Sequence, residues 1–252
     1  MPVILFSAVT DVGKMRENNQ DCYFVSEKMP YIYAVYDGMG GHAAGDTASK
    51  TARDAVKKYF EVNTPFDINE DKARNLLHGA LEYANKQIYL RAKNTPEYEG
   101  MGTTADVCFA DFEKLYIGHV GDSRVYLLRE GTLSQITKDH SLVEKLIDEG
   151  TITRQEARNH PNRNVITSAL GTDEKLDWSF YSYDMNQDDI ILICSDGVYE
   201  MLTDEEIRNA LVTDADISLT AQTLVDSAND KGGTDNITAV VLKYIDEQGG
   251  TK

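Results

Sequence analysis

Four aspartates adjoin glycine or small polar residues at the ends of apolar, strand-like runs. The runs read YAVYDG, YIGHVGDSR, ILICSDG and GGTDNITAVV, and the aspartates are Asp37, Asp122, Asp196 and Asp235. Any one of them alone is best explained as a turn residue, because Asp and Gly both favour turns. Together they indicate a site in which carboxylates do the chemistry.

Several packed carboxylates repel one another, and some must take up protons unless a cation neutralises them. Carboxylates without histidine or cysteine partners are typical ligands of hard divalent ions. Glycine beside such a ligand lets a main-chain carbonyl or a water approach without a side-chain clash. The set therefore predicts a site for Mg²⁺ or Mn²⁺, and the ligand type does not distinguish between these two ions.

The positions of the aspartates on their strands predict which of them meet. Asp37 and Asp196 follow their strands, whereas Asp235 precedes one. Because the end of one antiparallel strand lies beside the start of its neighbour, we expect these three at a single sheet edge. Asp21 precedes a strand that a short loop joins to the strand before Asp37, so a hairpin would place these two side by side. Asp122 is expected at the tip of a tight hairpin.

The stretch YAVYDGMGGHAAGD has a second interpretation. Gly38-x-Gly40-x-x-Ala43 loosely matches the dinucleotide-binding fingerprint of a nucleotide-dependent oxidoreductase. However, Asp37 would repel a pyrophosphate. The fingerprint also needs an acidic residue about 20 positions later, at the end of a second strand, where this chain has a helical pattern followed by Glu61. The metal site is the favoured interpretation, and the dinucleotide site is the weaker alternative.

Composition and charge limit the partners. With 25 Lys and Arg against 42 Asp and Glu, the net charge is −17, and such a chain repels nucleic acid and anionic membrane surfaces. No apolar run approaches the ~20 residues of a membrane helix. The N-terminus carries no basic leader. We therefore expect a cytoplasmic protein that binds neither nucleic acid nor a membrane.

The cysteines argue against one kind of phosphatase. Cys22, Cys108 and Cys194 are scattered through apolar stretches, which predicts buried free thiols rather than disulfides or a zinc site. Phosphatases with a cysteine nucleophile need a thiolate beneath a phosphate-binding loop that an arginine closes. None of the three cysteines is followed by arginine six residues later.

The patterns of apolar residues predict an α+β fold. Helices come as consecutive pairs instead of alternating with strands, which favours antiparallel sheets in a single domain spanning residues 1–252. Strands are predicted at 3–9, 22–27, 31–36, 104–112, 114–120, 124–130, 133–137, 188–195 and 236–245. Helices are predicted at about 44–60, 70–93 and 217–230, with short capped helices after Ser141, Thr153 and Thr203. The polar segment 157–172 is predicted to be a flap.

The chain resembles the metal-dependent serine/threonine phosphatases of the protein phosphatase 2C-like (PPM) family, in their compact bacterial form. Eight stretches match in the family's order and span nearly the whole chain. They are VGKMRENNQD (12–21), YAVYDGMGGHAAGD (33–46), GMGTTA (100–105), IGHVGDSRVYLL (117–128), ITKDHSLVEKLIDEG (136–150), NVITSALG (164–171), ILICSDGVYEML (191–202) and GGTDNITAVVL (232–242).

This resemblance implies a four-layer αββα fold, a β-sandwich of two antiparallel sheets flanked by pairs of helices, with metals at one edge. It implies that Asp37 bridges two Mn²⁺ or Mg²⁺ ions and that the Gly38 carbonyl contributes to one of them. Asp196 and Asp235 would hold the other ion. Asp122 and Asp196 would hold a weaker third ion.

The resemblance also implies the reaction, which is direct hydrolysis of phosphoserine and phosphothreonine in proteins by a metal-activated water, without a phosphoenzyme. Asp21 would orient the water, and Arg16 would grip the phosphate. The residues at about 145–172 would form the flap subdomain that screens substrates. The implied partners are phosphorylated proteins and a cognate serine/threonine kinase whose action the enzyme reverses. The expected oligomeric state is a monomer.

Two departures from the family pattern affect the expected site. Gln20 stands where the family often has Glu, and Met39 stands where many eukaryotic members have His. His42 is the nearest histidine and a candidate proton donor, although a plain role at the start of a helix is equally consistent with its position. His119 and His140 are expected to be structural. A catalytically inactive relative that only binds partners is disfavoured, because all four aspartates are present.

Overall fold

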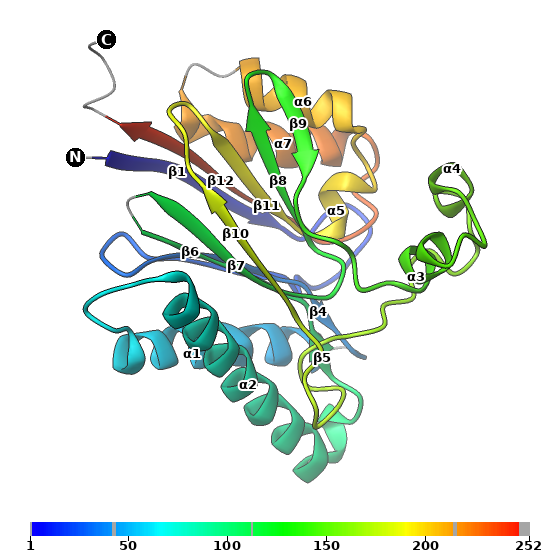
Figure 1. The fold of residues 1–252 in the computed structure, drawn as a ribbon. Helices are drawn as coiled ribbons and strands as arrows, with labels where there is room; N and C mark the ends of the chain where they lie inside the picture. The colour runs from blue at the N-terminus through cyan, green and yellow to red at the C-terminus, as the bar shows by residue number, and fades with distance from the viewer. Residues whose placement is uncertain (1, 42–43, 112, 214–215, 247–252) are drawn as a thin grey trace.

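Two antiparallel sheets of five strands face each other in the computed structural model, which describes residues 2–41, 44–111, 113–213 and 216–246 (Figure 1). The first sheet has the order β1 (Pro2–Asp11), β12 (Ile237–Asp246), β11 (Ile190–Cys194), β8 (Arg124–Arg129) and β9 (Thr132–Gln135). The second has the order β10 (Ser179–Asp184), β7 (Lys114–Val120), β6 (Ala105–Ala110), β3 (Tyr31–Tyr36) and β2 (Cys22–Val25).

The central strands β3, β6, β7, β8 and β11 are buried on both faces, which explains their apolar runs. Along β3, Tyr33 and Val35 point into the core between the sheets, whereas Ile32, Ala34 and Tyr36 belong to the core beneath the helices. Side chains alternate between the two faces of a strand, so one continuous apolar segment supplies both cores. This burial stabilises the sandwich that carries the predicted aspartates at its strand ends.

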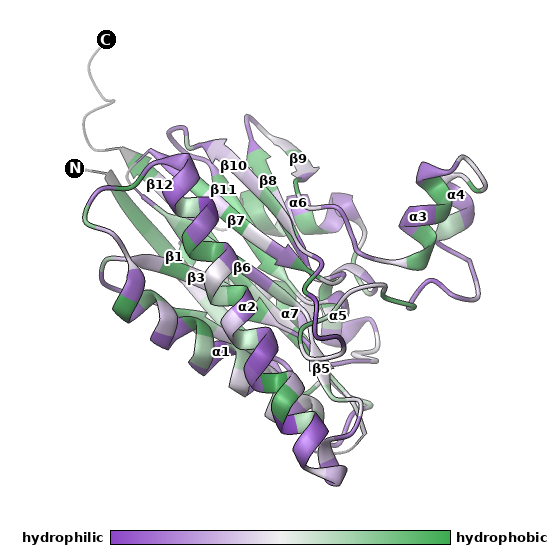
Figure 2. Ribbon diagram, turned by 60° about the horizontal axis from the view of Figure 1, so that its bottom comes forward, coloured by the Kyte–Doolittle hydropathy of each residue, from purple (hydrophilic) through white to green (hydrophobic). Residues whose placement is uncertain are grey.

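Helices cover the outer face of each sheet (Figure 1). The long helices α1 (Ala44–Asn63) and α2 (Glu70–Asn94) pack on the second sheet. The helices α6 (Asp204–Thr213) and α7 (Ile217–Asp230) lie on the first, together with the short α5 (Asp196–Tyr199). Figure 2 shows hydrophobic residues along the strands of the interior and hydrophilic ones on the outer helices. The expected α+β fold with four layers is confirmed.

Smaller elements lie at the end of the sandwich. The two-residue strands β4 (Gly38–Met39) and β5 (Gly102–Thr103) pair, and a 3₁₀ turn spans Pro96–Tyr98. The helices α3 (Leu142–Asp148) and α4 (Arg154–Ala157) project to the side of the sandwich (Figure 1). A bridge between Ser141 and Ile166 joins the two ends of this projecting segment. None of the described helices combines the length and apolar character needed to cross a membrane.

The structure corrects the prediction that Asp122 lies at the tip of a hairpin. The flanking strands β7 and β8 belong to different sheets, so the turn at Asp122 carries the chain from one sheet to the other. The strand β10 was not among those predicted from the sequence. This strand pairs with β7 alone, at the edge of its sheet, and its half-exposed residues lack a clear alternation.

The capping predictions hold with one partial exception. Thr153 and Glu156 form a reciprocal capping box, and Thr203 and Glu206 exchange the same pair of hydrogen bonds. The Ser141 hydroxyl accepts a hydrogen bond from the Glu144 N–H. The Glu144 carboxylate, however, accepts from the Arg154 guanidinium and not from the Ser141 N–H. A tertiary ion pair has replaced half of that local motif.

The packing of α2 against β7 predicts a position-dependent loss of stability. Leu81 is fully buried, and a Cβ on Gly118 of β7 would lie only 2.9 Å from its Cδ1. We expect Leu81→Ala to lower the free energy of unfolding by about 2–5 kcal/mol, since the cavity cannot collapse fully. Leu90→Ala, on the same helix but 41% exposed, should cost less than about 1 kcal/mol. Urea unfolding of the two variants measures the difference, and equal losses would contradict this packing.

Candidate metal centre

Five aspartates lie together at one end of the sandwich. Asp21 and Asp37 adjoin across the β2–β3 hairpin, where Cys22 pairs with Tyr36, as the sequence predicted. Asp196 and Asp235 flank the neighbouring strands β11 and β12 of the other sheet. The predicted meeting at a single sheet edge is therefore wrong in one respect, because the carboxylates gather across two facing sheets.

Asp21 joins the two sheets. Its Oδ2 accepts hydrogen bonds of 2.7 Å from the hydroxyls of Ser195 and Thr238, which belong to the opposite sheet. Its Oδ1 is buried and has no hydrogen-bond partner among the described residues. Burial raises the pKa of Asp21 to about 6, and the two hydroxyls oppose this shift. One oxygen is thus fixed in place while the other is left for a further ligand.

Asp37 stands where the second sheet ends. Its N–H donates to the Thr104 hydroxyl at 2.9 Å, and its carbonyl accepts from the Thr104 N–H and the Thr103 hydroxyl at the same distance. The main chain is therefore held on both sides of the carboxylate. Burial raises the pKa of Asp37 well above its usual range, and the nearby charges of Asp21 and Asp196 add to the shift.

The remaining carboxylates show the same mutual repulsion. Burial and then the charge of Asp122 raise the pKa of Asp196 well above its usual range, and the Asp196 Oδ1 is buried without a partner among the described residues. Burial and then the charge of Asp139 raise the pKa of Asp122 to about 7, against the opposing effect of Arg124. Uncompensated negative charge is thus concentrated at this end of the molecule.

The donor set fits a hard divalent cation. Two buried carboxylate oxygens of the cluster, one on Asp21 and one on Asp196, have no hydrogen-bond partner among the described residues. Only glycine fits at position 38, since a Cβ there would lie 2.2 Å from the Gly45 carbonyl oxygen and 2.5 Å from that of Gln20. Within the described residues, no three Asp, Glu, His or Cys side chains form a complete cage by themselves. Mg²⁺ typically takes one or two carboxylates and keeps several waters, so a complete cage is not required.

Arg16 lies at the rim of this cluster. Its guanidinium donates to the Asp235 Oδ2 at 2.7 Å, and its side chain is 53% exposed. The hydrogen bond that Arg16 donates to Asp235 is the main reason that the pKa of Arg16 is raised, with smaller effects from the charges of Asp196 and Asp37. The structure thus brings Arg16 to the carboxylates, although 219 residues separate it from Asp235.

The histidines and Gln20 occupy different settings. His42 lies outside the described residues, so its role stays a prediction. His119 is buried between Asp106, 2.8 Å from its Nδ1, and the Lys138 carbonyl, 3.0 Å from its Nε2. Burial lowers the pKa of His119, but Asp106 outweighs this and the net shift is upward. The Gln20 side chain donates to the Gly40 carbonyl at 3.3 Å.

Sequence reasoning missed the residues that hold the aspartates. Ser195 and Thr238 bind Asp21, and the Asn236 side chain accepts from the Gln20 N–H at 2.8 Å while donating to two carbonyls of the N-terminal loop. The sequence does show each of these polar residues next to a strand of apolar residues. In the structure all three side chains are almost fully buried. Buried polar groups need partners, and here the partners surround the carboxylates.

A second group of missed residues holds the turn at Asp122. The Tyr199 hydroxyl donates to the Asp122 carbonyl at 3.0 Å. The Arg124 guanidinium lies over the Tyr199 ring, 3.6 Å from its centroid, and forms hydrogen bonds with both carboxylate oxygens of Asp139. The turn between the two sheets is therefore fixed by an aromatic ring and an ion pair.

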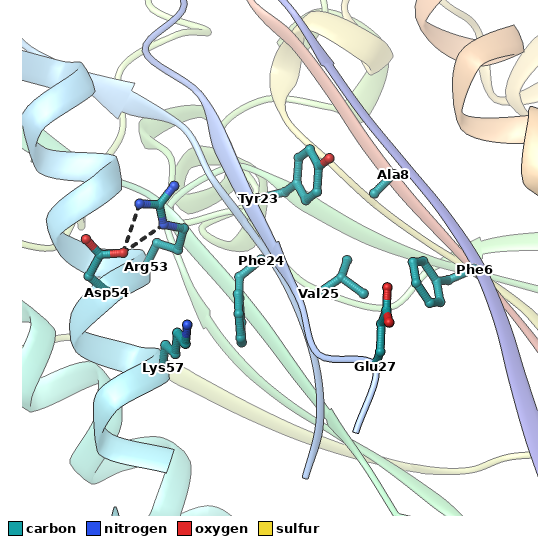
Figure 3. Close-up of a pocket in the computed structure, with 9 residues that line it drawn as sticks. All are labelled: Phe6, Ala8, Tyr23, Phe24, Val25, Glu27, Arg53, Asp54 and Lys57. Atoms are coloured by element: carbon teal, nitrogen blue, oxygen red, sulfur yellow. Dashed lines mark hydrogen bonds and ion pairs between the residues drawn. The ribbon is translucent and has the colours of Figure 1, made fainter. Parts of the chain in front are cut away.

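Two of the surface hollows that described residues line bear on the choice of the site. One, of about 370 Å³, is lined by Asp122 and Asp196 and extends to the projecting helices α3 and α4. The other, of about 500 Å³, lies at the open edge between β1 and β2, beside α1 (Figure 3). Apolar side chains such as Phe6 and Val25 and the Arg53–Asp54 pair line it, and none of the five aspartates does. The smaller hollow is therefore the candidate functional site.

The raised pKa values predict how the metal-free protein responds to pH. A folded-state pKa above the unfolded value of about 3.9 means that the folded protein holds extra protons, so stability falls as the pH rises through the folded pKa. For Asp21 and Asp122 this window extends from about pH 4 to about pH 7. Asp196→Asn removes one of the repelling charges. In EDTA at pH 8 the melting temperature of this variant should equal or exceed that of the wild type. The difference between the two melting temperatures should be smaller at pH 5.

Asp184→Asn is the matched control, because the hydrogen bond from Lys114 lowers the pKa of the exposed Asp184. It should give no gain at pH 8. A lower melting temperature for Asp196→Asn than for the wild type at pH 8 would contradict the repulsion.

Known proteins resemble this chain in sequence and in fold. The family model described as protein phosphatase 2C matches residues 14–237. The serine/threonine phosphatase stp of Listeria welshimeri serovar 6b is 35% identical over 236 residues, which cover 93% of each chain. The S. agalactiae serine/threonine phosphatase structure has a TM-score of 0.89 at 31% identity and covers 97% of this chain and 100% of its own. The PstP catalytic domain in complex with two manganese ions has a TM-score of 0.86 at 34% identity, covering 98% and 100%. The chain therefore belongs to the protein phosphatase 2C family of serine/threonine phosphatases.

Proposed function

We propose that the chain hydrolyses phosphoserine and phosphothreonine in proteins with two Mn²⁺ or Mg²⁺ ions held by its aspartate cluster. The observation that carries this proposal is the gathering of five carboxylates, two with unpartnered buried oxygens, beside Arg16 at one end of the sandwich. The relatives named as serine/threonine phosphatases and the two manganese ions in the PstP structure support it.

The proposed ligands divide by sheet. Asp37, at the end of β3 in the second sheet, would contact both ions, and the Gly38 carbonyl would contribute to one of them. Asp196 and Asp235, from the opposite sheet, would complete the second site. Asp122 together with Asp196 would hold a third ion more weakly. When bound, such ions lower the pKa of a water and stabilise charge on the oxygens around phosphorus during an in-line displacement.

Asp21 is proposed to orient the attacking water. Ser195 and Thr238 hold its Oδ2 by hydrogen bonds, which fixes the direction of its Oδ1. That oxygen has no partner among the described residues and can accept a hydrogen bond from a water in the cluster. A fixed acceptor places the water without an entropic cost at the moment of reaction.

Arg16 is proposed to bind the phosphate. Its planar guanidinium can form two parallel hydrogen bonds to phosphoryl oxygens, whereas an ammonium binds as a point charge. The ion pair with Asp235 keeps it at the rim of the cluster, and the exposed side chain leaves room to turn toward a ligand. His42 stays a candidate proton donor for the leaving serine or threonine.

The proposed cellular role includes a partner kinase, a compartment and an oligomeric state. A cognate serine/threonine kinase follows from the reaction itself. The three cysteines are buried free thiols, which suits a reducing cytoplasm. We propose a monomer of one domain in which the residues at about 145–172, including α4, form a flap over the candidate site.

Removing divalent metal should abolish turnover. We expect hydrolysis of a phosphothreonine peptide and of p-nitrophenyl phosphate to be lost in EDTA and restored by Mn²⁺ or Mg²⁺, because the carboxylates cannot act on phosphate without a cation between them. Steady-state rates before and after restoration measure the effect, and an EDTA-treated sample returned to chelator-free buffer is the control. Full activity with metal shown to be absent by elemental analysis would refute the proposal.

Arg16→Lys should weaken phosphate binding while keeping the charge. The loss of a two-pronged contact should lower kcat/KM on a phosphopeptide about tenfold, since hydrogen bonds to charged groups contribute about 1.5–3 kcal/mol. Lys14→Arg is the reverse exchange two residues away, on an exposed lysine 3.8 Å from Asp230, and should change kcat/KM little. Equal kinetics for Arg16→Lys and the wild type would place Arg16 away from the phosphate.

A further inference from the structure

The hollow at the candidate site continues along the projecting segment. Asp122 and Asp196 line one part of it, and arginines of the segment that includes α4 line another. Four arginines border the hollow, namely Arg124, Arg154, Arg158 and Arg163. A peptide that places its phosphorylated residue at the aspartate cluster and continues along the hollow would run close to these cations.

Three of the four arginines already have carboxylate partners. Arg124 pairs with Asp139 at 2.7 Å. Arg154 pairs with Glu144 at 3.0 Å, and Arg163 pairs with Glu200 at 3.3 Å. A ligand that used any of these guanidinium groups would have to share or displace an existing ion pair.

Arg158 differs from the other three. Its side chain is exposed and has no carboxylate within ion-pair distance in the described part of the chain. This is notable in a protein whose net charge is −17. Its charge is thus free to interact with a ligand in the hollow.

Among the described residues that line the hollow, the other charged groups that form no ion pair are acidic. Asp122 and Asp196 belong to the proposed metal site, where cations would neutralise them. Asp204 lies in the first turn of α6, where the helix dipole stabilises a carboxylate. Among the described residues that line the hollow, Arg158 is therefore the free cation, and an anionic group is the ligand that it complements.

We propose that Arg158 recognises an oxyanion on the substrate beside the phosphorylated residue, so that the enzyme prefers phosphopeptides with a neighbouring acidic side chain or second phosphate. This inference rests on the proposed function, since it requires the phosphorylated residue to sit at the aspartates. The planar guanidinium suits carboxylate and phosphate alike. The position of Arg158 away from the cluster makes it a determinant of specificity and not of the chemical step.

The test compares three phosphothreonine peptides that differ only in the residues flanking the phosphothreonine. One carries alanines, one carries aspartates, and one carries an additional phosphoserine blocked against hydrolysis as a phosphonate. With Mn²⁺ present, the wild type should show a kcat/KM about twofold to fivefold higher for the two anionic peptides, which is the upper part of the range for an exposed ion pair. Raising the salt concentration should reduce this ratio, because salt screens exposed charges.

Arg158→Ala should bring the ratio close to one. Arg158→Lys should keep part of it, with a larger loss for the phosphonate peptide, where two-pronged binding matters most. The matched control is Arg91→Ala, which removes the same charge from the exposed surface of α2, remote from the hollow, and should keep the wild-type ratio. A preference for only one of the two anionic peptides would still support the proposal and would identify carboxylate or phosphate as the recognised group.

Other outcomes would overturn the inference. A wild-type ratio near one, or an equal fall in the ratio for Arg158→Ala and Arg91→Ala, would show that Arg158 does not select substrates. Those results would leave the proposed function intact, because the alanine peptide would still be hydrolysed. A wild-type enzyme that hydrolyses none of the peptides in the presence of Mn²⁺ would refute the proposed function and this inference together.

Discussion

A single buried carboxylate holds the two sheets together at the functional end of the molecule. Asp21, only 4% exposed, accepts hydrogen bonds from Ser195 and Thr238 of the opposite sheet. Those two residues are themselves linked, since the Thr238 N–H donates to the Ser195 hydroxyl oxygen and the Ser195 N–H donates to the Thr238 carbonyl. Hydrogen bonds to a charged group contribute about 1.5–3 kcal/mol each, which offsets part of the cost of burying Asp21.

The rest of the site depends on that junction. Once Asp21 is tied to the first sheet, its hairpin neighbour Asp37 faces Asp196 and Asp235 across the sandwich. Burial and mutual repulsion raise the pKa values of Asp21, Asp37 and Asp196. The repulsion destabilises the fold at neutral pH, a cost that a bound cation removes. Strain of this kind is common at functional sites, where the groups that do chemistry are held in positions that stability alone would not favour.

The charge distribution of the protein follows from the same constraint. An acidic surface keeps the chain away from other polyanions, yet its reaction requires it to bind a phosphate. Most of the arginines around the cluster are held by carboxylates, as Arg16 is by Asp235 and Arg124 by Asp139. The positive charge that can bind a phosphate is therefore concentrated at the rim of the cluster and along the hollow, whereas the net charge of the protein is negative.

The local features of the fold could be predicted from the amino-acid sequence. Apolar periodicity located most strands and both long helices, and the turn signals placed aspartates at strand ends. The hairpin that brings Asp21 beside Asp37 was predictable, because two strands joined by a short loop usually pair with each other. The ordered motifs were also sufficient to indicate the family.

The sheet that each strand joins could not be predicted and is known from the tertiary structure. A buried strand reads as an apolar run in either sheet, so no pattern reveals that the chain crosses between sheets at Asp122, or that β10 closes an edge. The contacts that define the site span 174 residues from Asp21 to Ser195 and 219 from Arg16 to Asp235. Such contacts depend on the packing of whole sheets against each other, so they cannot be predicted from the local propensities of the residues.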